Sequence, residues 1–355
     1  MKALFFIIIF VAIAVACWQF VKLLGLTKVE NATATPKENN INGWLMLGLM
    51  GFLYGLMLYS MYGGKDVLLP QLSGSEEGKD IDFLFKITMG LILVVQFILQ
   101  FIIFYFTWNY RGIKGRKALF FADSHRLEFW WTVTPAVVLA GLIIYGLWTW
   151  NEVMDTSGAE DPLVIELYAQ QFNWNARYAG EDRVLGNANV RNIEGLNVMG
   201  VDMTDKNAAD DIPLTADPVS FVKELHLPIG RKVIFKMRSQ DVLHSAYMPH
   251  FRAQMNCVPG MVTQFGFTPT ITTAEMRQNP DIIEKVQNIN NIRRDKQAEI
   301  EEAGQELIYE FDYLLLCNKI CGKSHYNMQM KIIVETQEEF DAWMAEQQTF
   351  ANSLN

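Results

Sequence analysis

The distribution of apolar residues divides the chain near residue 150. Before this point apolar residues form long runs that few charges interrupt, and after it they form short runs separated by polar stretches, glycine and proline. A helix needs about 20 apolar residues to cross the hydrocarbon core of a bilayer. We therefore predict four transmembrane helices, at residues 3–21, 44–62, 87–108 and 127–150.

Charges beside the third and fourth runs predict how these runs cross the membrane. The loop between them is short and basic, with Arg111, Lys114, Arg116, Lys117 and Arg126. The loop before the third run is rich in Asp and Glu. By the positive-inside rule the basic loop is cytoplasmic, so the chain after residue 150 is expected on the outer face.

The first run also has features of a signal peptide. It follows Met1-Lys2 and contains Ala14-Val-Ala16-Cys17, which is similar to a cleavage or lipidation site. Cleavage would leave three spans and put the region after residue 150 inside, against the basic loop. Either all four runs cross, with the N-terminus outside, or the first run does not cross, and we favour four spans.

Short β-rich runs follow the fourth apolar run, at residues 163–167, 233–237, 262–267 and 331–335. Glycine and proline separate them, which is typical of a small Greek-key β-sandwich or barrel. Residues 183–217 are predicted to be an Asn-, Asp- and Gly-rich loop, and residues 273–306 a charged helical insertion. The predicted fold is an α-helical membrane region followed by an all-β domain at residues 151–345, with a tail at 346–355.

The composition agrees with a membrane-anchored chain. Of 355 residues, 50% are hydrophobic and 19% are charged, which is too apolar for one soluble domain. The net charge of -9 argues against nucleic acid as a partner and favours a basic partner.

One segment near the C-terminus concentrates metal-ligating side chains, namely Cys317, Cys321, His325 and Met328. Thiolate, imidazole and thioether together suit copper, because zinc rarely recruits a thioether and hard cations prefer oxygen. A further histidine, His244, lies upstream in Asp-Val-Leu-His-Ser. Two His, one Cys and one Met would suffice for a single copper, and the second Cys is enough to bridge a pair.

Two alternatives remain open for these residues. Cys317 and Cys321 could form a disulfide, as cysteines of extracytoplasmic domains commonly do, although a disulfide requires neither the following His and Met nor the upstream His. His250 is the strongest rival to His244 as a ligand, and the sequence context favours His244.

The other histidines and the remaining thiol of the outer region carry weaker signals. His125 lies in a charged loop and His226 in an apparent strand, so a structural or solvated role is expected for each. Cys257 stands alone and is expected to be a buried free thiol. The sequence contains no Cys-x2-Cys-His, so no fused cytochrome c domain is expected in it.

Over roughly residues 85–345 the chain resembles the cytochrome c oxidase subunit II family. The resemblance is carried by Asp-Val-x-His244-Ser, by Cys317-x3-Cys321-Gly-x2-His-x2-Met and by Glu128-x2-Trp-Thr-x2-Pro. It implies a cupredoxin barrel with a binuclear CuA centre. In that centre each of two His would bind one copper, two Cys would bridge, and a Met and a backbone carbonyl would be weak ligands; the six residues are His244, His325, Cys317, Cys321, Met328 and Lys319.

The resemblance also implies the function and the partners. Such a subunit accepts electrons from cytochrome c, or from a docked cytochrome c domain, and passes them to subunit I. Subunit I holds the haems and CuB and reduces oxygen to water with proton pumping, and subunit III is a further partner. The expected location is a bacterial plasma membrane, with the β domain on the outer, periplasmic face. The family has one helical hairpin, matching residues 84–150, so residues 1–65 would be an additional transmembrane pair.

Two other functions are compatible with parts of the pattern. A quinol oxidase subunit II has the same hairpin and barrel without CuA and acts as a docking and structural module, but it lacks the cysteines that this chain has. The CuA domain of a nitrous oxide reductase would require a large propeller domain that this sequence does not contain.

Three positions deserve separate expectations. Glu128 matches a family carboxylate at the entrance of a proton-uptake path, and it could equally be a helix N-terminal acid. Phe172 stands where the family usually has an electron-admitting Trp, and Trp174 either belongs to that entry region or packs a barrel end. Lys319 replaces the usual Glu that holds magnesium. A lysine has no acceptor, so the magnesium site is in doubt.

Overall fold

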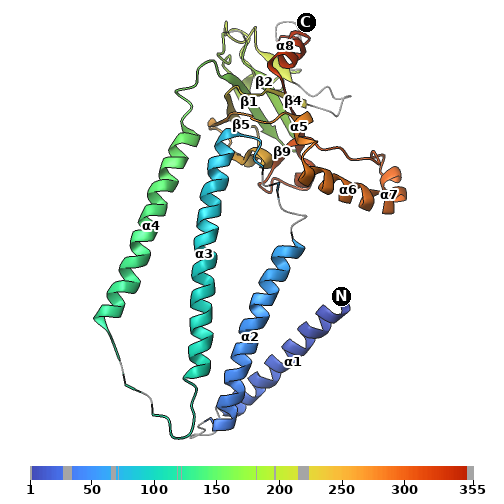
Figure 1. Cartoon of the computed structure of the whole chain (residues 1–355). Coiled ribbons are helices and arrows are strands. Elements are labelled where there is room, and N and C mark those ends of the chain that lie inside the picture. Colours follow the sequence, from blue (N-terminus) through green and yellow to red (C-terminus); the bar gives the residue numbers. More distant parts are fainter. Residues whose placement is uncertain are drawn as a thin grey trace. The chain divides into compact units, whose positions relative to one another are not determined.

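The computed structural model describes residues 2–26, 34–64, 69–70, 72–117, 119–120, 122–180, 182–195, 197–214 and 224–349. The chain forms two compact units, Met1–Gly63 with Ile92–Ser124, and Gly64–Leu91 with His125–Asn355. Figure 1 shows long helices in the first part of the chain and strands after the fourth helix. The change in the apolar pattern near residue 150 is therefore a change from helix to sheet.

Four helices correspond to the four apolar runs: α1 (Lys2–Leu26), α2 (Pro36–Gly63), α3 (Glu76–Asn109) and α4 (His125–Met154). By length and composition α2, α3 and α4 are able to cross a membrane. Most of their apolar side chains are exposed, as lipid-facing surfaces require. The apolar part found in α1 is the shorter stretch Val11–Lys22. Among the described residues three membrane-capable helices are thus established, and the expected fourth is not among them.

Within the first unit α2 packs against α3. The Tyr54 hydroxyl donates to the Phe97 carbonyl at 2.9 Å, and the rings of Trp44 and Trp108 meet edge to face at 5.4 Å. Helix α2 is therefore joined to α3 by specific contacts.

Within the second unit the start of α3 is anchored to the β domain. The Ser75 hydroxyl donates to the Phe251 carbonyl at 2.6 Å. The Arg252 guanidinium donates to both carboxylate oxygens of Asp82, at 2.8 and 2.9 Å. A bidentate pair of this kind fixes orientation as well as distance.

The β domain consists of two five-stranded sheets. The first contains, in spatial order, β3 (Ile212–Leu214), β2 (Asn173–Tyr178), β1 (Leu163–Gln170), β5 (Val233–Ser239) and β8 (Thr263–Phe267). The second contains β4 (Glu224–Pro228), β10 (Gln329–Glu335), β9 (Tyr313–Cys317), β6 (His244–Met248) and β7 (Ala253–Cys257). The pairs β1–β5 and β4–β10 are parallel, and the other pairs are antiparallel.

One cluster of buried side chains takes residues from both sheets, among them Ile165, Phe235, Leu225 and Tyr313. Three sulfur residues of the predicted metal segment belong to this cluster: Cys317, Cys321 and Met328. Because protein cores are close-packed, these sulfur atoms have little freedom to move.

The two interrupting stretches differ in structure. As far as it is described, the stretch expected as a loop holds β3 and the single turn η2 (Val190–Asn192); residues 196 and 215–217 lie outside the described residues. The stretch expected to be helical contains α5 (Thr273–Met276), α6 (Pro280–Asp295) and α7 (Gln297–Glu302).

A further helix, α8 (Gln337–Ala345), follows β10 and is not predicted above. A capping box starts it, in which Thr336 and Glu339 each accept from the other's backbone N–H. Phe340 is buried, and the Trp343 ring stacks on His226 at 4.1 Å. Of the expected tail, residues 350–355 lie outside the described residues.

Candidate metal centre

The pairing of β6 with β9 brings the predicted ligands together. Ala246 of β6 lies opposite Cys317 at the end of β9, so His244, at the start of β6, comes close to that cysteine. The loop after β9 returns through the single turn η4 (His325–Asn327) and supplies Cys321, His325 and Met328. Residues far apart in sequence thus meet at one end of the second sheet.

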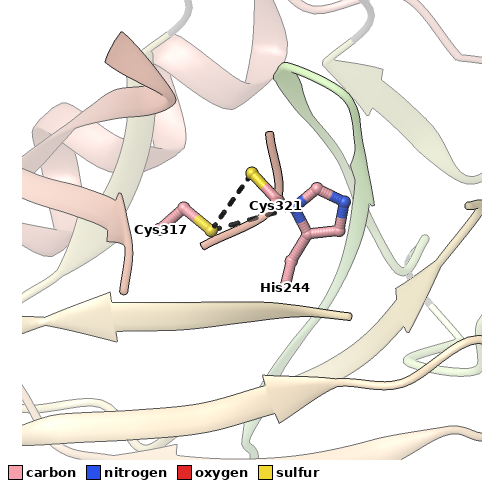
Figure 2. A group of neighbouring side chains, drawn as sticks. All are labelled: His244, Cys317 and Cys321. Carbon is pink, nitrogen blue, oxygen red and sulfur yellow. Dashed lines mark hydrogen bonds between the residues drawn. The ribbon is translucent and has the colours of Figure 1, made fainter. Parts of the chain in front are cut away.

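The donor atoms face one another. Cys317 Sγ lies 3.8 Å from His244 Nδ1 and 3.9 Å from Cys321 Sγ. Figure 2 shows Cys317 in contact with both of these residues. Cys321 Sγ in turn lies 3.7 Å from His325 Nδ1 and 3.9 Å from Met328 Sδ. The carbonyl oxygen of Lys319 lies 3.2 Å from Cys317 Sγ.

The two cysteines are free thiols rather than a disulfide. Their sulfur atoms are 3.9 Å apart, whereas a disulfide bond is about 2.05 Å long. His244, Cys317 and Cys321 offer ligand atoms that all lie within 4.8 Å of one another, which suits a metal ion. His325 and Met328 extend this group on the side of Cys321.

Burial changes the pKa of one thiol in this group. His244 is completely buried and Cys321 is 6% exposed. Burial, followed by the nearby Cys317, raises the pKa of the Cys321 thiol to about 11. A metal cation would displace that proton and supply the positive charge that a buried thiolate needs.

Asp241 orients His244. Its Oδ1 accepts from His244 Nε2 at 2.8 Å, which directs Nδ1 of the same ring toward the sulfur atoms. The backbone N–H groups of Gln171 and Val242 donate to the same carboxylate, at 2.7 and 2.6 Å. Burial acts to raise the pKa of Asp241, but the hydrogen bond with His244 and those from the two amides outweigh it and lower this pKa.

Gln171 and Phe172 contact the loop that carries Cys321. The Gln171 side-chain amide donates to the Cys321 carbonyl, and the half-buried Phe172 ring lies against Gly322. Gly322 has φ 147°, and a Cβ there would lie 2.8 Å from Phe172. Only glycine therefore allows this close approach.

Trp174 is fully buried beside the candidate ligands. Its ring lies 6.4 Å from the His244 ring, and its indole N–H donates to the Met328 carbonyl at 3.4 Å. It therefore packs against the candidate ligands instead of forming part of the surface.

The remaining predicted residues lie apart from this group. Glu128 is in the first turn of α4, half-exposed, with its carboxylate 3.5 Å from His125. His250 packs edge to face on Phe311 at 5.0 Å, and burial lowers its pKa to about 4. The structure thus brings His244, and not its rival His250, to the cysteines.

The other two weaker candidates also have structural surroundings. His226 stacks on Trp343 and lies 2.8 Å from a carboxylate oxygen of Glu335. Cys257 is a buried free thiol opposite His244 in the β6–β7 ladder, and burial raises its pKa to about 12.

The supporting roles of Asp241 and Gln171 are not predicted from the sequence. Asp241 stands three residues before His244, a spacing that permits its hydrogen bond with the ring. No comparable signal in the sequence connects Gln171 with Cys321, because 150 positions separate them.

Comparison with known proteins assigns the family. Residues 67–148 match the family described as "Cytochrome C oxidase subunit II, transmembrane domain". The "Alternative cytochrome c oxidase subunit 2" of Bradyrhizobium diazoefficiens is 32% identical over 247 residues, which cover 70% of this chain and 73% of that relative. The "Cytochrome c oxidase subunit 2" of Thermostichus vulcanus is 21% identical over 81% of this chain and 80% of its own length.

The fold and the soft-ligand group define a membrane-anchored β-domain protein with a candidate metal centre. The chain belongs to the cytochrome c oxidase subunit II family, and so to an oxidoreductase complex of the membrane. Among solved structures, the periplasmic domain of subunit II of cytochrome oxidase from Bradyrhizobium japonicum is 16% identical to it. That match covers 54% of this chain and 95% of the other, with a TM-score of 0.30, and the family assignment rests on the sequence relatives.

Replacing Asp241 with Ala should weaken metal binding while leaving the fold intact. The carboxylate fixes the His244 ring, and loss of such a supporting group lowers metal affinity by roughly 10- to 100-fold. Competition with a copper chelator measures the affinity. Asp202→Ala, which removes a comparable hydrogen bond to a neighbouring amide in another loop, serves as the matched control. Equal copper affinity in both variants would contradict the assigned role.

Proposed function

We propose that this chain accepts electrons at a binuclear CuA centre and passes them to the haem–copper subunit of a cytochrome c oxidase. The observation that carries the proposal is the meeting of two free thiols, two imidazoles, a thioether and a carbonyl at one end of the β domain, with the thiols, the thioether and the His244 ring buried. A single copper of the electron-transfer type uses only one thiolate, so the second cysteine favours a pair of ions.

The donor set divides evenly between two ions. Cys317 and Cys321 would bridge them, His244 would bind the ion on one side, and His325 the ion on the other. The bound copper pair supplies single-electron transfer with the charge shared between two ions. Met328 and the carbonyl of Lys319, each close to one of the sulfur atoms, would be the weak ligands.

The protein's own contribution is to hold the donors and exclude water. Three of the proposed ligands, Cys317, Cys321 and Met328, belong to a close-packed core. Asp241 holds His244, and Trp174 holds the Met328 carbonyl. Donors that are fixed before and after electron transfer keep reorganisation small.

We propose that Phe172 is a docking contact and not a redox relay, because its ring is far harder to oxidise than that of Trp. The half-buried ring beside Gly322 supports this role. Trp174, although in the family's entry region, is proposed to stabilise the ligands from within the core.

The proposed arrangement in the membrane has four spans with the N-terminus outside. Residues 1–65 would form the additional pair, residues 84–150 the hairpin, and residues 151–345 a Greek-key cupredoxin barrel on the outer face of a bacterial plasma membrane. The basic loop between α3 and α4 and the helical character of α1 support this arrangement.

The proposed partners are oxidase subunits I and III, together with cytochrome c or a docked cytochrome c domain as donor. Subunit I would hold the haems and CuB, reduce oxygen and pump protons. Glu128 is proposed to lie at the entrance of a proton path into subunit I. Its half-exposed position in the first turn of α4, next to the basic loop, supports this role only if that loop is cytoplasmic.

A CuA-free quinol oxidase subunit is the less favoured function. Both cysteines are present and face each other, and the relatives cited above carry the name cytochrome c oxidase.

Changing Cys321 to Ser should abolish the binuclear site. It removes one bridge and the neighbour of both His325 and Met328, so the copper content should fall from two ions per chain to one or none. Copper analysis and the visible spectrum of the purified chain test this. Cys257→Ser, at the buried thiol outside the proposed ligand set, should keep both ions. A wild-type chain that binds one zinc and no copper would contradict the proposal.

The four-span arrangement predicts opposite results for a reporter that is active only in the cytoplasm. Inserted at Lys114 in the basic loop, it should be active, and fused at Lys2 it should be inactive. Activity at Lys2 would show that the first run does not cross as proposed. Inactivity at Lys114 would also remove the proton-entry role of Glu128.

Because Lys319 stands where the family usually has Glu, we predict that the magnesium site between subunits I and II is absent or built differently. A backbone carbonyl is indifferent to the side chain, so copper binding should persist, but an exposed ammonium cannot ligate magnesium. We expect the Lys319 ammonium to pair with carboxylates of subunit I. After manganese substitution, the assembled oxidase should show no manganese EPR signal coupled to copper, and Lys319→Glu should create one. A manganese signal coupled to copper in the oxidase with Lys319 intact would refute the prediction that this magnesium site is absent or built differently.

A further inference from the structure

Four loops meet at the end of the β domain that holds the proposed ligands. Hydrogen bonds join Gln171 to Cys321 and to Asp241, and an isolated bridge joins Ser239 to Pro259. These contacts gather residues 171–172, 239–243, 258–262 and 318–327 around the metal group.

This end exposes large apolar side chains. From three of the four loops, six of them are exposed by 37% to 90%: Val242, Leu243, Met261, Val262, Ile320 and Tyr326. Single exposed apolar residues are ordinary, but a group gathered at a functional site indicates an interaction surface. We call these six residues the apolar rim.

The same loops carry little charge. Their only carboxylate is Asp241, whose oxygen atoms accept hydrogen bonds from His244 and from two backbone amides. Lys323 is exposed, and Lys319 is assigned above to the border with subunit I. The acidic groups behind the net charge of -9 lie elsewhere, for example in α7 and α8.

We infer that the electron donor docks on the apolar rim through apolar contacts rather than through charge. The inference rests on the proposed function and names its partner: a redox protein whose exposed redox edge is surrounded by an apolar face of low charge. Apolar contact would expel water between the two redox groups, and the half-buried Phe172 ring next to this rim would extend the same surface.

The choice of a donor with an apolar face of low charge follows from charge complementarity. A lysine-rich donor, which the overall charge of the chain would favour, would find no free carboxylate in these four loops and would meet Lys323 instead. Without complementary charges, association is not steered and responds weakly to salt.

The test uses the assembled oxidase and two cytochromes c as probes, one with a lysine-rich face and one with an apolar face of low charge. Between low and physiological salt, the second-order rate with the apolar-faced donor should change by less than about twofold, whereas steered pairs change by roughly tenfold or more. At physiological salt the apolar-faced donor should also be oxidised faster.

Val262→Asp puts a charge in the rim and should weaken binding of the apolar-faced donor by roughly tenfold, raising KM with kcat unchanged. Donor binding to the immobilised oxidase gives a readout independent of turnover. Ile308→Asp makes the same change at a residue that is 69% exposed and lies beyond α7, before the opposite end of β9. It should bind the donor like the wild type.

Two results would overturn the inference while leaving the proposed function intact. One is a wild-type oxidase that prefers the lysine-rich donor and loses its rate steeply with salt. The other is a Val262→Asp subunit that binds copper but no longer assembles with subunit I, which would assign the rim to the subunit border. Failure of the proposed function would be distinct: the wild-type chain would hold no copper and oxidise neither donor.

Discussion

The antiparallel pairing of β6 with β9 is the constraint on which the rest of the site depends. It sets Ala246 opposite Cys317 and so fixes the distance between a histidine and a cysteine that are 73 residues apart in sequence. A shift of this ladder by one residue would turn the side chains of β9 to the other face of the sheet. The loop that follows Cys317 is short, and it places the other candidate ligands, Cys321, His325 and Met328, beside this cysteine.

The site is stiff because it belongs to the core. Cys317, Cys321 and Met328 pack with residues from both sheets, while Asp241 and Trp174 hold His244 and the Met328 carbonyl. The anchoring of the start of α3 by Arg252 and Asp82 ties the same domain to a membrane helix. Such rigidity suits the proposed electron-transfer role, and the inferred docking on the apolar rim would need no charged surface.

Much of this could be predicted from the sequence, where local patterns carry the signal. Long apolar runs predicted the helices, although the apolar stretch found in α1, Val11–Lys22, is too short to establish a fourth span. The spacing of the cysteines, His325 and Met328 predicted a metal group, and the sequence context favoured His244 over His250. The strand register that brings His244 to the cysteines has no local signal in the sequence. Helix α8 was missed although Thr336 and Glu339 form a recognisable cap. The contact between Gln171 and Cys321 depends on the tertiary fold and has no local signal.

The electron paramagnetic resonance spectrum of the copper-loaded, oxidised full-length chain tests the central claim most directly. If Cys317 and Cys321 bridge two ions, one unpaired electron should be shared equally, and its hyperfine splitting should be that of two equivalent copper nuclei. The splitting of a single copper nucleus, or an EPR-silent chain loaded with one metal ion, would contradict the account.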